Sequence, residues 1–221
     1  MTEGDDTAPK DREKLIRAKE QWARDGRLLT GRPGDPARDR LPPGQRLVTD
    51  WPVLDLGVTP RPDPEKWRLR VDGLVERALI LDWQEFLGLP QTHLTTDIHC
   101  VTGWSRFDNA WEGVTARAIL EAVRPKADAR HCIFYSRDGY TTNVRLDRFA
   151  GEDVLLAHRW NGEALTAEHG GPVRVVMPRW YFWKSAKWLR RIEISAVDRP
   201  GYWEERGYHN DGDPWTEERY S

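Results

Sequence analysis

The chain has 221 residues, enough for one large hydrophobic core or for a domain with a tail. Its 34 lysines and arginines are balanced by 36 aspartates and glutamates, so no overall basic charge attracts it to nucleic acid or to an anionic membrane. Two cysteines are too few for a disulfide framework, and no apolar run is long enough to cross a bilayer.

The N-terminal part is interpreted as a polar tail, residues 1–45, followed by a folded domain, residues 46–221. Within the tail, residues 10–25 predict a short helix, and the prolines and glycines of 26–44 predict an extended connection. No positively charged start leads into an apolar core, as it would in a secretion signal. We therefore expect a cytoplasmic protein.

The domain begins with a predicted β-hairpin. Apolar and polar residues alternate over 67–71, Asp72-Gly73 predicts a tight turn, and 74–81 predict the second strand.

Helices are expected to be short. Asp82 with Glu85 three residues later predicts a capped helix, and Thr115 predicts the cap of a helix over 116–123. Further strands are predicted over 94–101, 131–136, 140–144, 153–158, 173–177 and 189–197. Because helices and strands do not alternate regularly, the pattern favours an α+β domain with a mixed, mainly antiparallel sheet.

Cys100 ends a predicted strand in the polar stretch HCVTGWSR, residues 99–106. A lone cysteine is more often inert packing than a ligand or a nucleophile, and packing is the interpretation for Cys132 in its apolar strand. A nearby cation stabilises a thiolate, however, and Gly103 permits close approach of another group. A cysteine hydrolase is the weaker hypothesis, because neighbouring His99 would point to the opposite face of the strand.

Two later segments are suited to an oxyanion. In HGGPVR, residues 169–174, glycines expose backbone N–H groups and Arg174 can make a forked contact, although a plain loop entering a strand has the same pattern. In KSAK, residues 184–187, a hydroxyl lies between two ammonium groups. The cations and aromatic residues of 179–191 also suit single-stranded nucleic acid, but the neutral overall charge opposes a nucleic-acid partner.

Together these segments resemble the molybdopterin-binding domain of the sulfite oxidase family, from about Val48 to the C-terminus. The similarity is greatest to small bacterial sulfite oxidase-like proteins and to the catalytic subunit of the bacterial methionine sulfoxide reductase. The resemblance implies a sulfite oxidase-type fold and a molybdenum–molybdopterin cofactor without haem. It also implies that Cys100 is the thiolate ligand of the metal.

The resemblance further implies a set of residues that contact the cofactor: Leu54, Asp55, Cys100, Ser136, His169, Arg174, Ser185, Ala186 and Lys187. Arg174, Ser185 and Lys187 would neutralise its terminal phosphate. Arg106 is expected to face the substrate as a catalytic residue, with a surface ion pair as the alternative. Trp51 replaces a polar residue of the family and is left outside this set.

The resemblance implies an oxidoreductase that transfers an oxygen atom to or from a small sulfur-containing or similar substrate. A non-catalytic molybdopterin carrier or electron-transfer accessory is the alternative. We expect a monomer without a membrane span that exchanges electrons with a separate partner. The residues do not decide the direction of the reaction.

Overall fold

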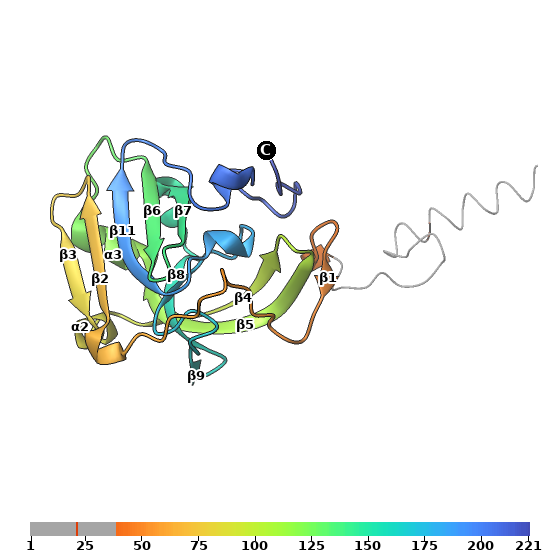
Figure 1. The fold of residues 1–221 in the computed structure, drawn as a ribbon, viewed down its shortest axis with the longest axis horizontal. Coiled ribbons are helices and arrows are strands. Elements are labelled where there is room, and N and C mark those ends of the chain that lie inside the picture. The colour runs from red at the N-terminus through yellow and green to blue at the C-terminus, as the bar shows by residue number, and fades with distance from the viewer. Residues whose placement is uncertain (1–20, 22–38) are drawn as a thin grey trace, which may run out of the picture. The chain divides into compact units, whose positions relative to one another are not determined.

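The computed structural model describes Gln21 and residues 39–221, and the chain divides into two units, Met1–Leu41 and Pro42–Ser221. The helix predicted over 10–25 lies outside the described residues, apart from Gln21, which is helical. The second unit is built on two β-sheets (Figure 1). None of the helices among the described residues has the length and apolar content needed to cross a membrane.

The five-stranded sheet has the order β3-β2-β11-β6-β7, and these strands lie side by side at one end of the domain (Figure 1). Its strands are β2 (Arg68–Gly73), β3 (Leu79–Asp82), β6 (His131–Ser136), β7 (Thr141–Arg145) and β11 (Leu189–Ser195). Only β11 and β2 run parallel within it; the other pairs are antiparallel.

The six-stranded sheet has the order β1-β5-β8-β10, with β4 added to β5 and β9 added to β8. Its strands are β1 (Arg46–Leu47), β4 (Thr92–Cys100), β5 (Trp104–Thr115), β8 (Leu155–Trp160), β9 (Glu163–Ala164) and β10 (Arg174–Val176). β4 and β5 form a long curved hairpin that extends toward β1 (Figure 1). The prediction of a mixed, mainly antiparallel α+β fold is confirmed.

The helices are short: α2 (Trp83–Leu87), α3 (Ala116–Val123), α4 (Leu146–Phe149), η2 (Pro64–Lys66), η3 (Phe182–Lys184) and η4 (Glu204–Arg206). Both predicted caps are confirmed. The Asp82 carboxylate accepts from the Glu85 backbone at 2.9 Å and Glu85 accepts from the Asp82 backbone at 2.8 Å. Thr115 Oγ1 accepts from the Ala118 backbone at 3.2 Å, which caps α3.

Two local predictions were wrong. The strand predicted over 74–81 begins only at Leu79, because the Leu74 backbone N–H donates to Ile194 on β11 and the chain turns away from β2. β5 was missed, although with 12 residues it is the longest strand. Its aspartate, asparagine and glycine have low strand propensity and interrupt the alternation of apolar and polar residues that marks a strand in sequence.

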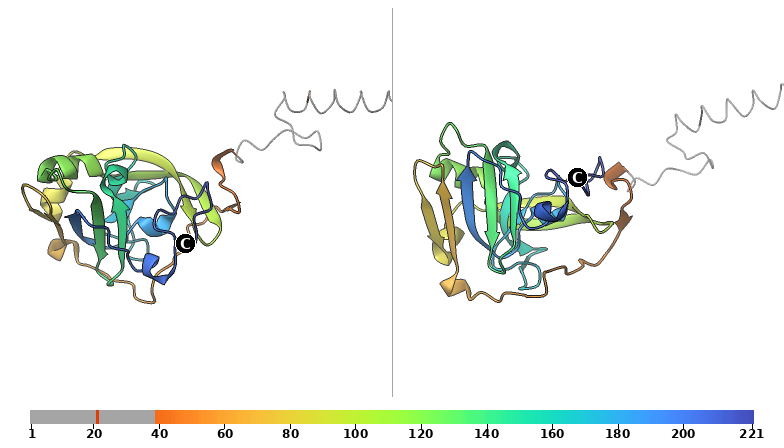
Figure 2. Two further views of the ribbon diagram at one scale, coloured as in Figure 1. Left: turned by 90° about the horizontal axis from the view of Figure 1, so that it is seen from above. Right: turned by 45° about the horizontal axis from the view of Figure 1, so that its top comes forward.

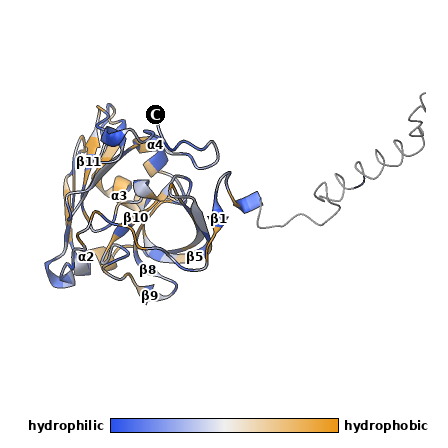
Figure 3. Ribbon diagram, turned by 45° about the vertical axis from the view of Figure 1, so that its right-hand side comes forward, coloured by the Kyte–Doolittle hydropathy of each residue, from blue (hydrophilic) through white to orange (hydrophobic). Residues whose placement is uncertain are grey.

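The core divides into a larger and a smaller cluster. The larger contains Trp67, Phe86, Phe134 and Phe149, with parts of α3 and β11 among the apolar segments coloured orange in Figure 3. The smaller lies around β4, β5 and β8 and contains Trp51, Ile98, Cys100, Trp104, Trp111, Leu155, Ala157, Leu165 and Val176. Cys132 is fully buried in the larger cluster, whereas Cys100 lies in the smaller one.

The C-terminal segment, defined as residues 198–221, leaves β11 and runs toward the turn of the β4–β5 hairpin, as its blue trace in Figure 2 shows. It reaches that turn, because the Arg219 guanidinium donates to the carbonyl of Val101. Loops from distant parts of the sequence therefore converge on Cys100.

Candidate functional site: a cavity beside Cys100

A cavity of about 370 Å³ lies where the β4–β5 turn meets the loops around residues 51–56, 136–140, 168–174 and 182–188 and the C-terminal segment. The structure brings most of the expected site residues to its wall: Leu54, Asp55, Cys100, Ser136, His169, Arg174, Ser185 and Lys187. These residues come from both sheets, so the cavity exists only in the folded chain.

Cys100 is the last residue of β4 and is 6% exposed. The chain turns back immediately after it: Gly103 takes a φ of 89°, which favours glycine, and its N–H donates to the Cys100 carbonyl at 3.0 Å. Sγ lies 3.2 Å from Thr102 Oγ1, and burial raises the pKa of the thiol. Without a bound metal the thiol is therefore protonated at neutral pH, which opposes a role as a free nucleophile.

His99 points away from the cavity, as strand geometry predicts. Its Nδ1 lies 2.8 Å from Ser105 Oγ, and burial lowers its pKa to about 4. His99 is not part of the cavity wall, so it does not supply the base that a cysteine hydrolase needs.

Arg174 is 3% exposed, and its guanidinium donates to the carbonyls of His169 at 2.9 Å and Ser185 at 2.9 Å. No carboxylate in the described part of the chain forms an ion pair with it. Burial without a counter-charge lowers the pKa of Arg174. A buried cation on a cavity wall with only carbonyl partners is suited to an anionic ligand.

Lys187 adds a second cation. Its Nζ donates to the carbonyl of Glu168 at 2.8 Å, and burial, followed by the nearby charge of Arg174, lowers its pKa to about 8. Ser185 Oγ accepts from the Met177 backbone at 2.9 Å and keeps its own proton to donate. Ser136 Oγ is buried with no hydrogen-bond partner among the described residues. Buried polar groups are rarely left unpaired, so this hydroxyl is free for a bound molecule.

Trp51 was left outside the predicted set, but the structure places it in the cavity wall. Its ring stacks on that of His169 with centroids 3.9 Å apart and planes at 18°, and its carbonyl accepts from His169 Nε2 at 3.2 Å. His169 Nδ1 faces the Thr166 hydroxyl at 3.2 Å. Both ring nitrogens of His169 therefore have partners within the protein. No sequence motif surrounds Trp51 to reveal this role.

Trp203 and Tyr208 line the cavity from the C-terminal segment and were also missed. The Tyr208 ring packs on Trp203, with centroids 5.0 Å apart, and on Trp183, with centroids 5.3 Å apart. Burial and the neighbouring Tyr220 raise the pKa of Tyr208. Tyr140 also lines the cavity, but its hydroxyl is held by the Trp183 carbonyl at 2.6 Å.

Arg106 and Ala186 are not part of the cavity wall. The Arg106 guanidinium lies over the Trp160 ring, 4.7 Å from its centroid, and donates to Asn109 and to the Thr49 carbonyl. Ala186 is 1% exposed and its carbonyl accepts from the Val175 backbone, which is a structural role. The structure therefore does not bring Arg106 to the place where a substrate would bind.

Leu54 and Asp55 lie at the mouth of the cavity, and Leu54 is 52% exposed. The Asp55 carboxylate accepts from the Gly57 backbone at 2.8 Å and the Thr59 hydroxyl at 2.9 Å, which lowers its pKa. Since the Asp55 carboxylate is occupied by hydrogen bonds within its own loop, the backbone is the part of Asp55 that can contact a ligand.

Comparison with known proteins identifies the family. The model of the oxidoreductase molybdopterin binding domain matches residues 56–203. The chain belongs to this family. It is 48% identical over 183 residues to the uncharacterized oxidoreductase YuiH of Bacillus subtilis (strain 168), covering 82% of this chain and 92% of that protein.

More distant relatives carry functional names. The chain is 28% identical over 172 residues to the protein-methionine-sulfoxide reductase catalytic subunit MsrP of Ralstonia nicotianae, covering 68% of this chain and 52% of that one. It is 28% identical over 179 residues to the sulfite oxidase of Arabidopsis thaliana, covering 65% and 46%. It therefore spans about half the length of these two relatives.

The fold has a counterpart among solved structures. The sulfane dehydrogenase SoxCD from Paracoccus pantotrophus matches with a TM-score of 0.58 at 24% identity, covering 63% of this chain and 40% of that one. The protein is thus a molybdopterin-dependent oxidoreductase of the sulfite oxidase-like family and uses the molybdenum cofactor.

The cavity fits such a cofactor. The unpaired Ser136 hydroxyl and the uncompensated Arg174 charge are the groups that a polar pterin with a phosphate would satisfy. No group of three or more histidine, cysteine or acidic side chains in the described part of the chain could hold a metal ion unaided. A metal at Cys100 would therefore need ligands other than such a group of side chains, and the dithiolene of a molybdopterin can supply them.

Proposed function

We propose that this enzyme transfers an oxygen atom between water and a small, neutral, sulfur-containing or similar substrate, with the Cys100 thiolate as the molybdenum ligand. The observation that carries the proposal is the shared cavity: among the described residues, its lining contains one buried thiol together with Arg174 and Lys187, and no carboxylate forms an ion pair with either cation.

The bound cofactor supplies two-electron redox chemistry at the metal, and the protein binds, orients and shields it. Arg174 and Lys187 would neutralise the phosphate, and the hydroxyls of Ser136 and Ser185 would donate hydrogen bonds to the pterin or its phosphate. The Cys100 thiol must lose its proton when the metal binds, because a coordinating thiol is deprotonated.

The aromatic wall near Cys100 favours a neutral substrate. It consists of Trp183, Trp203 and Tyr208, and these side chains carry no positive charge at neutral pH. The charges of Arg174 and Lys187 act on one another, whereas the cation that acts on Cys100 is Arg219, which is not part of the cavity wall. The three aromatic side chains of this wall offer no positive charge to an oxyanion such as sulfite or nitrate.

A sulfoxide would have a partner on this wall. Its oxygen is a hydrogen-bond acceptor, and the Tyr208 hydroxyl, which is protonated at neutral pH, is a hydrogen-bond donor. In the reducing direction the sulfur–oxygen bond breaks, two protons and two electrons are taken up, and the oxygen leaves as water. Oxidation is the reverse.

The electrons would come from or go to a separate protein partner. We propose that the protein is a monomer in the cytoplasm, where the free thiols of Cys100 and Cys132 are stable.

The metal content of two cysteine variants tests the ligand assignment. In protein made in a host that synthesises the cofactor, we expect about one molybdenum per wild-type chain. Cys100→Ser should lose it. Cys132→Ser is the matched control and should retain it, because Cys132 is buried in the other core cluster. Full retention of metal by Cys100→Ser would contradict the assignment.

Turnover with artificial electron donors and acceptors tests the reaction. We expect a neutral sulfoxide, either free or as methionine sulfoxide in a peptide, to give a higher kcat/KM than sulfite or nitrate. A higher kcat/KM for an anion would refute the proposal of a neutral substrate but would not contradict the proposed cofactor site. A metal-loaded protein with no substrate-dependent redox change would instead indicate a carrier.

A further inference from the structure

A fully buried ion pair lies behind the aromatic wall of the cavity. Lys184 in η3 and Glu204 in η4 have side-chain exposures of 0% and 2%, and Nζ lies 2.5 Å from Glu204 Oε1. Nζ also donates to the Asn143 carbonyl at 2.9 Å and to its side-chain oxygen at 3.2 Å. The pair thus joins the C-terminal segment to β7 and to the helix that precedes Ser185.

The same carboxylate oxygen holds two further donors. Glu204 Oε1 accepts from Trp183 Nε1 at 2.9 Å and from Thr142 Oγ1 at 2.9 Å. Trp183 is therefore fixed by its indole N–H, while its backbone carbonyl is fixed by the Tyr140 hydroxyl. The side chain and the backbone of Trp183 are therefore both held by residues of the protein, so its position does not require a bound molecule.

Contacts connect the other two residues of the aromatic wall, Trp203 and Tyr208, to Glu204. Trp203 is its neighbour in the chain, the Tyr208 backbone donates to the Trp203 carbonyl at 3.1 Å, and the Tyr208 ring meets the Trp183 ring edge-on at 82°. A shift of Glu204 would consequently move all three of these aromatic side chains in the cavity wall.

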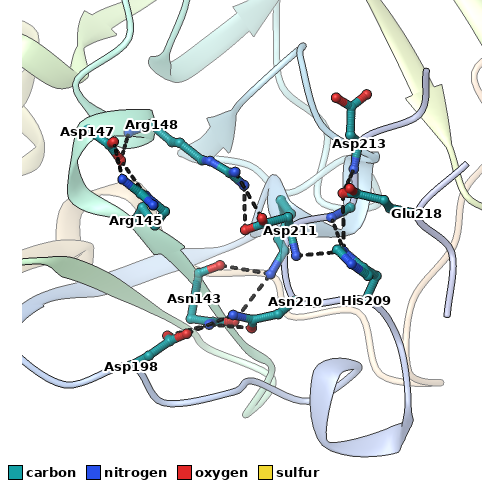
Figure 4. Close-up of polar contacts among 12 residues, drawn as sticks. Asn143, Arg145, Asp147, Arg148, Asp198, His209, Asn210, Asp211, Asp213 and Glu218 are labelled. Atoms are coloured by element: carbon teal, nitrogen blue, oxygen red, sulfur yellow. Dashed lines mark hydrogen bonds and ion pairs between the residues drawn. The ribbon is translucent and has the colours of Figure 1, made fainter. Parts of the chain in front are cut away.

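Other contacts keep the C-terminal segment attached. Figure 4 shows the Asn143 amide bridging Asp198 and Asn210, at 2.6 and 2.8 Å, and Arg148 paired with Asp211. The buried pair is thus not the only tie in the described part of the chain. A buried ion pair is also weak evidence for stability, because apolar residues of similar volume can replace such pairs without loss. The position of the Lys184–Glu204 pair behind the aromatic wall points to a role in positioning that wall.

We propose that Glu204 is a positioning residue that sets the aromatic substrate wall, and that Lys184 holds it in place. The inference rests on the proposed function, because it assigns the wall of Trp183, Trp203 and Tyr208 to the substrate. Cofactor binding at Arg174 and Lys187 does not depend on it.

Two double variants separate the effect of the hydrogen bonds that position Trp183 from the effect of burying the charges of Lys184 and Glu204. Lys184→Met with Glu204→Gln removes both charges and keeps a side-chain oxygen for Trp183 and Thr142. Lys184→Met with Glu204→Leu removes the charges and that oxygen, with nearly the same volume. Glu205→Gln, at the neighbouring exposed position, is the control.

We expect all three variants to retain molybdenum. The Leu double variant should raise the KM for the neutral sulfoxide about tenfold with kcat little changed, and the Gln double variant should stay close to wild type. The indole N–H resonance of Trp183 should move in the Leu variant alone, which reports the lost hydrogen bond without an activity assay.

Equal KM values in the Gln and Leu variants, despite a moved Trp183 resonance, would overturn the proposal. If the Leu variant does not fold, Trp183→Phe removes the donor from the other side and must raise KM in the same way; an unchanged KM there would also overturn it. Absence of molybdenum from the wild-type protein would refute the proposed function instead, and the two failures are therefore distinguishable.

Discussion

The lowered pKa of Lys187 predicts that anion binding in the cavity depends on pH. Burial and the nearby Arg174 charge bring the pKa to about 8 from 10.5. A bound anion favours the charged amine and raises this pKa again, so binding above pH 8 takes up a proton. Affinity is therefore full below pH 8 and is lost as the pH rises through that value.

The size of the effect follows from the pKa. With a value of about 8, roughly nine-tenths of Lys187 is charged at pH 7 and roughly one-tenth at pH 9. If only the charged form binds, the affinity falls about tenfold, or about 1.4 kcal/mol. Cofactor-free full-length protein titrated with sulfate tests this, because the charge of sulfate is constant over the range. Quenching of Trp188, whose ring centroid lies 4.3 Å from Lys187 Nζ, reports binding.

Three variants serve as controls for this titration. Lys187→Arg should bind sulfate equally at both pH values, and Lys187→Met should bind weakly at both. Lys66→Met removes an amine whose side chain is 86% exposed and should leave the titration unchanged. Wild-type affinity that is equal at pH 7 and pH 9, or a tenfold fall that persists in Lys187→Met, would refute the reasoning.

Three further substitutions have defined outcomes. Asp82→Ala removes the cap of α2 and should cost about 1 kcal/mol of unfolding free energy, measured by urea denaturation; no change would mean that the cap is not used in solution. Gly73→Ala places a Cβ 2.2 Å from the Ile194 carbonyl oxygen at a φ of +91°, so it should cost at least about 2 kcal/mol in the same assay, and wild-type stability would contradict this backbone path. Trp51→Leu removes the stack on His169 and should lower the molybdenum content of purified protein without unfolding it; unchanged content would exclude Trp51 from the cofactor site.

Local sequence patterns predicted the elements whose signals are short-range. The capping residues Asp82 and Thr115 act within a few residues of themselves. β5 was missed because its pairing with the three neighbouring strands β1, β4 and β8, and not its own composition, holds it extended.

Most residues that we propose to contact the cofactor were predicted from motifs, whereas the residues of the aromatic wall were not predicted. Arg174 and Lys187 lie in recognisable glycine- and lysine-containing segments, whereas Trp51, Trp203 and Tyr208 lie outside such segments. Arg106 lies close to Cys100 in sequence, yet its side chain is held over the Trp160 ring and is not part of the cavity wall. Proximity in sequence therefore did not predict proximity in the site.

The sequence by itself determined the family, the mainly antiparallel fold and the residues suited to a metal–pterin–phosphate group, because these depend on residue type and spacing. Tertiary structure alone decided which side chains share the cavity with Cys100. Burial leaves Arg174 without a counter-charge and Ser136 without a partner, and it packs the aromatic wall around Glu204. Those properties arise from segments that meet only when both sheets and the C-terminal segment are in place.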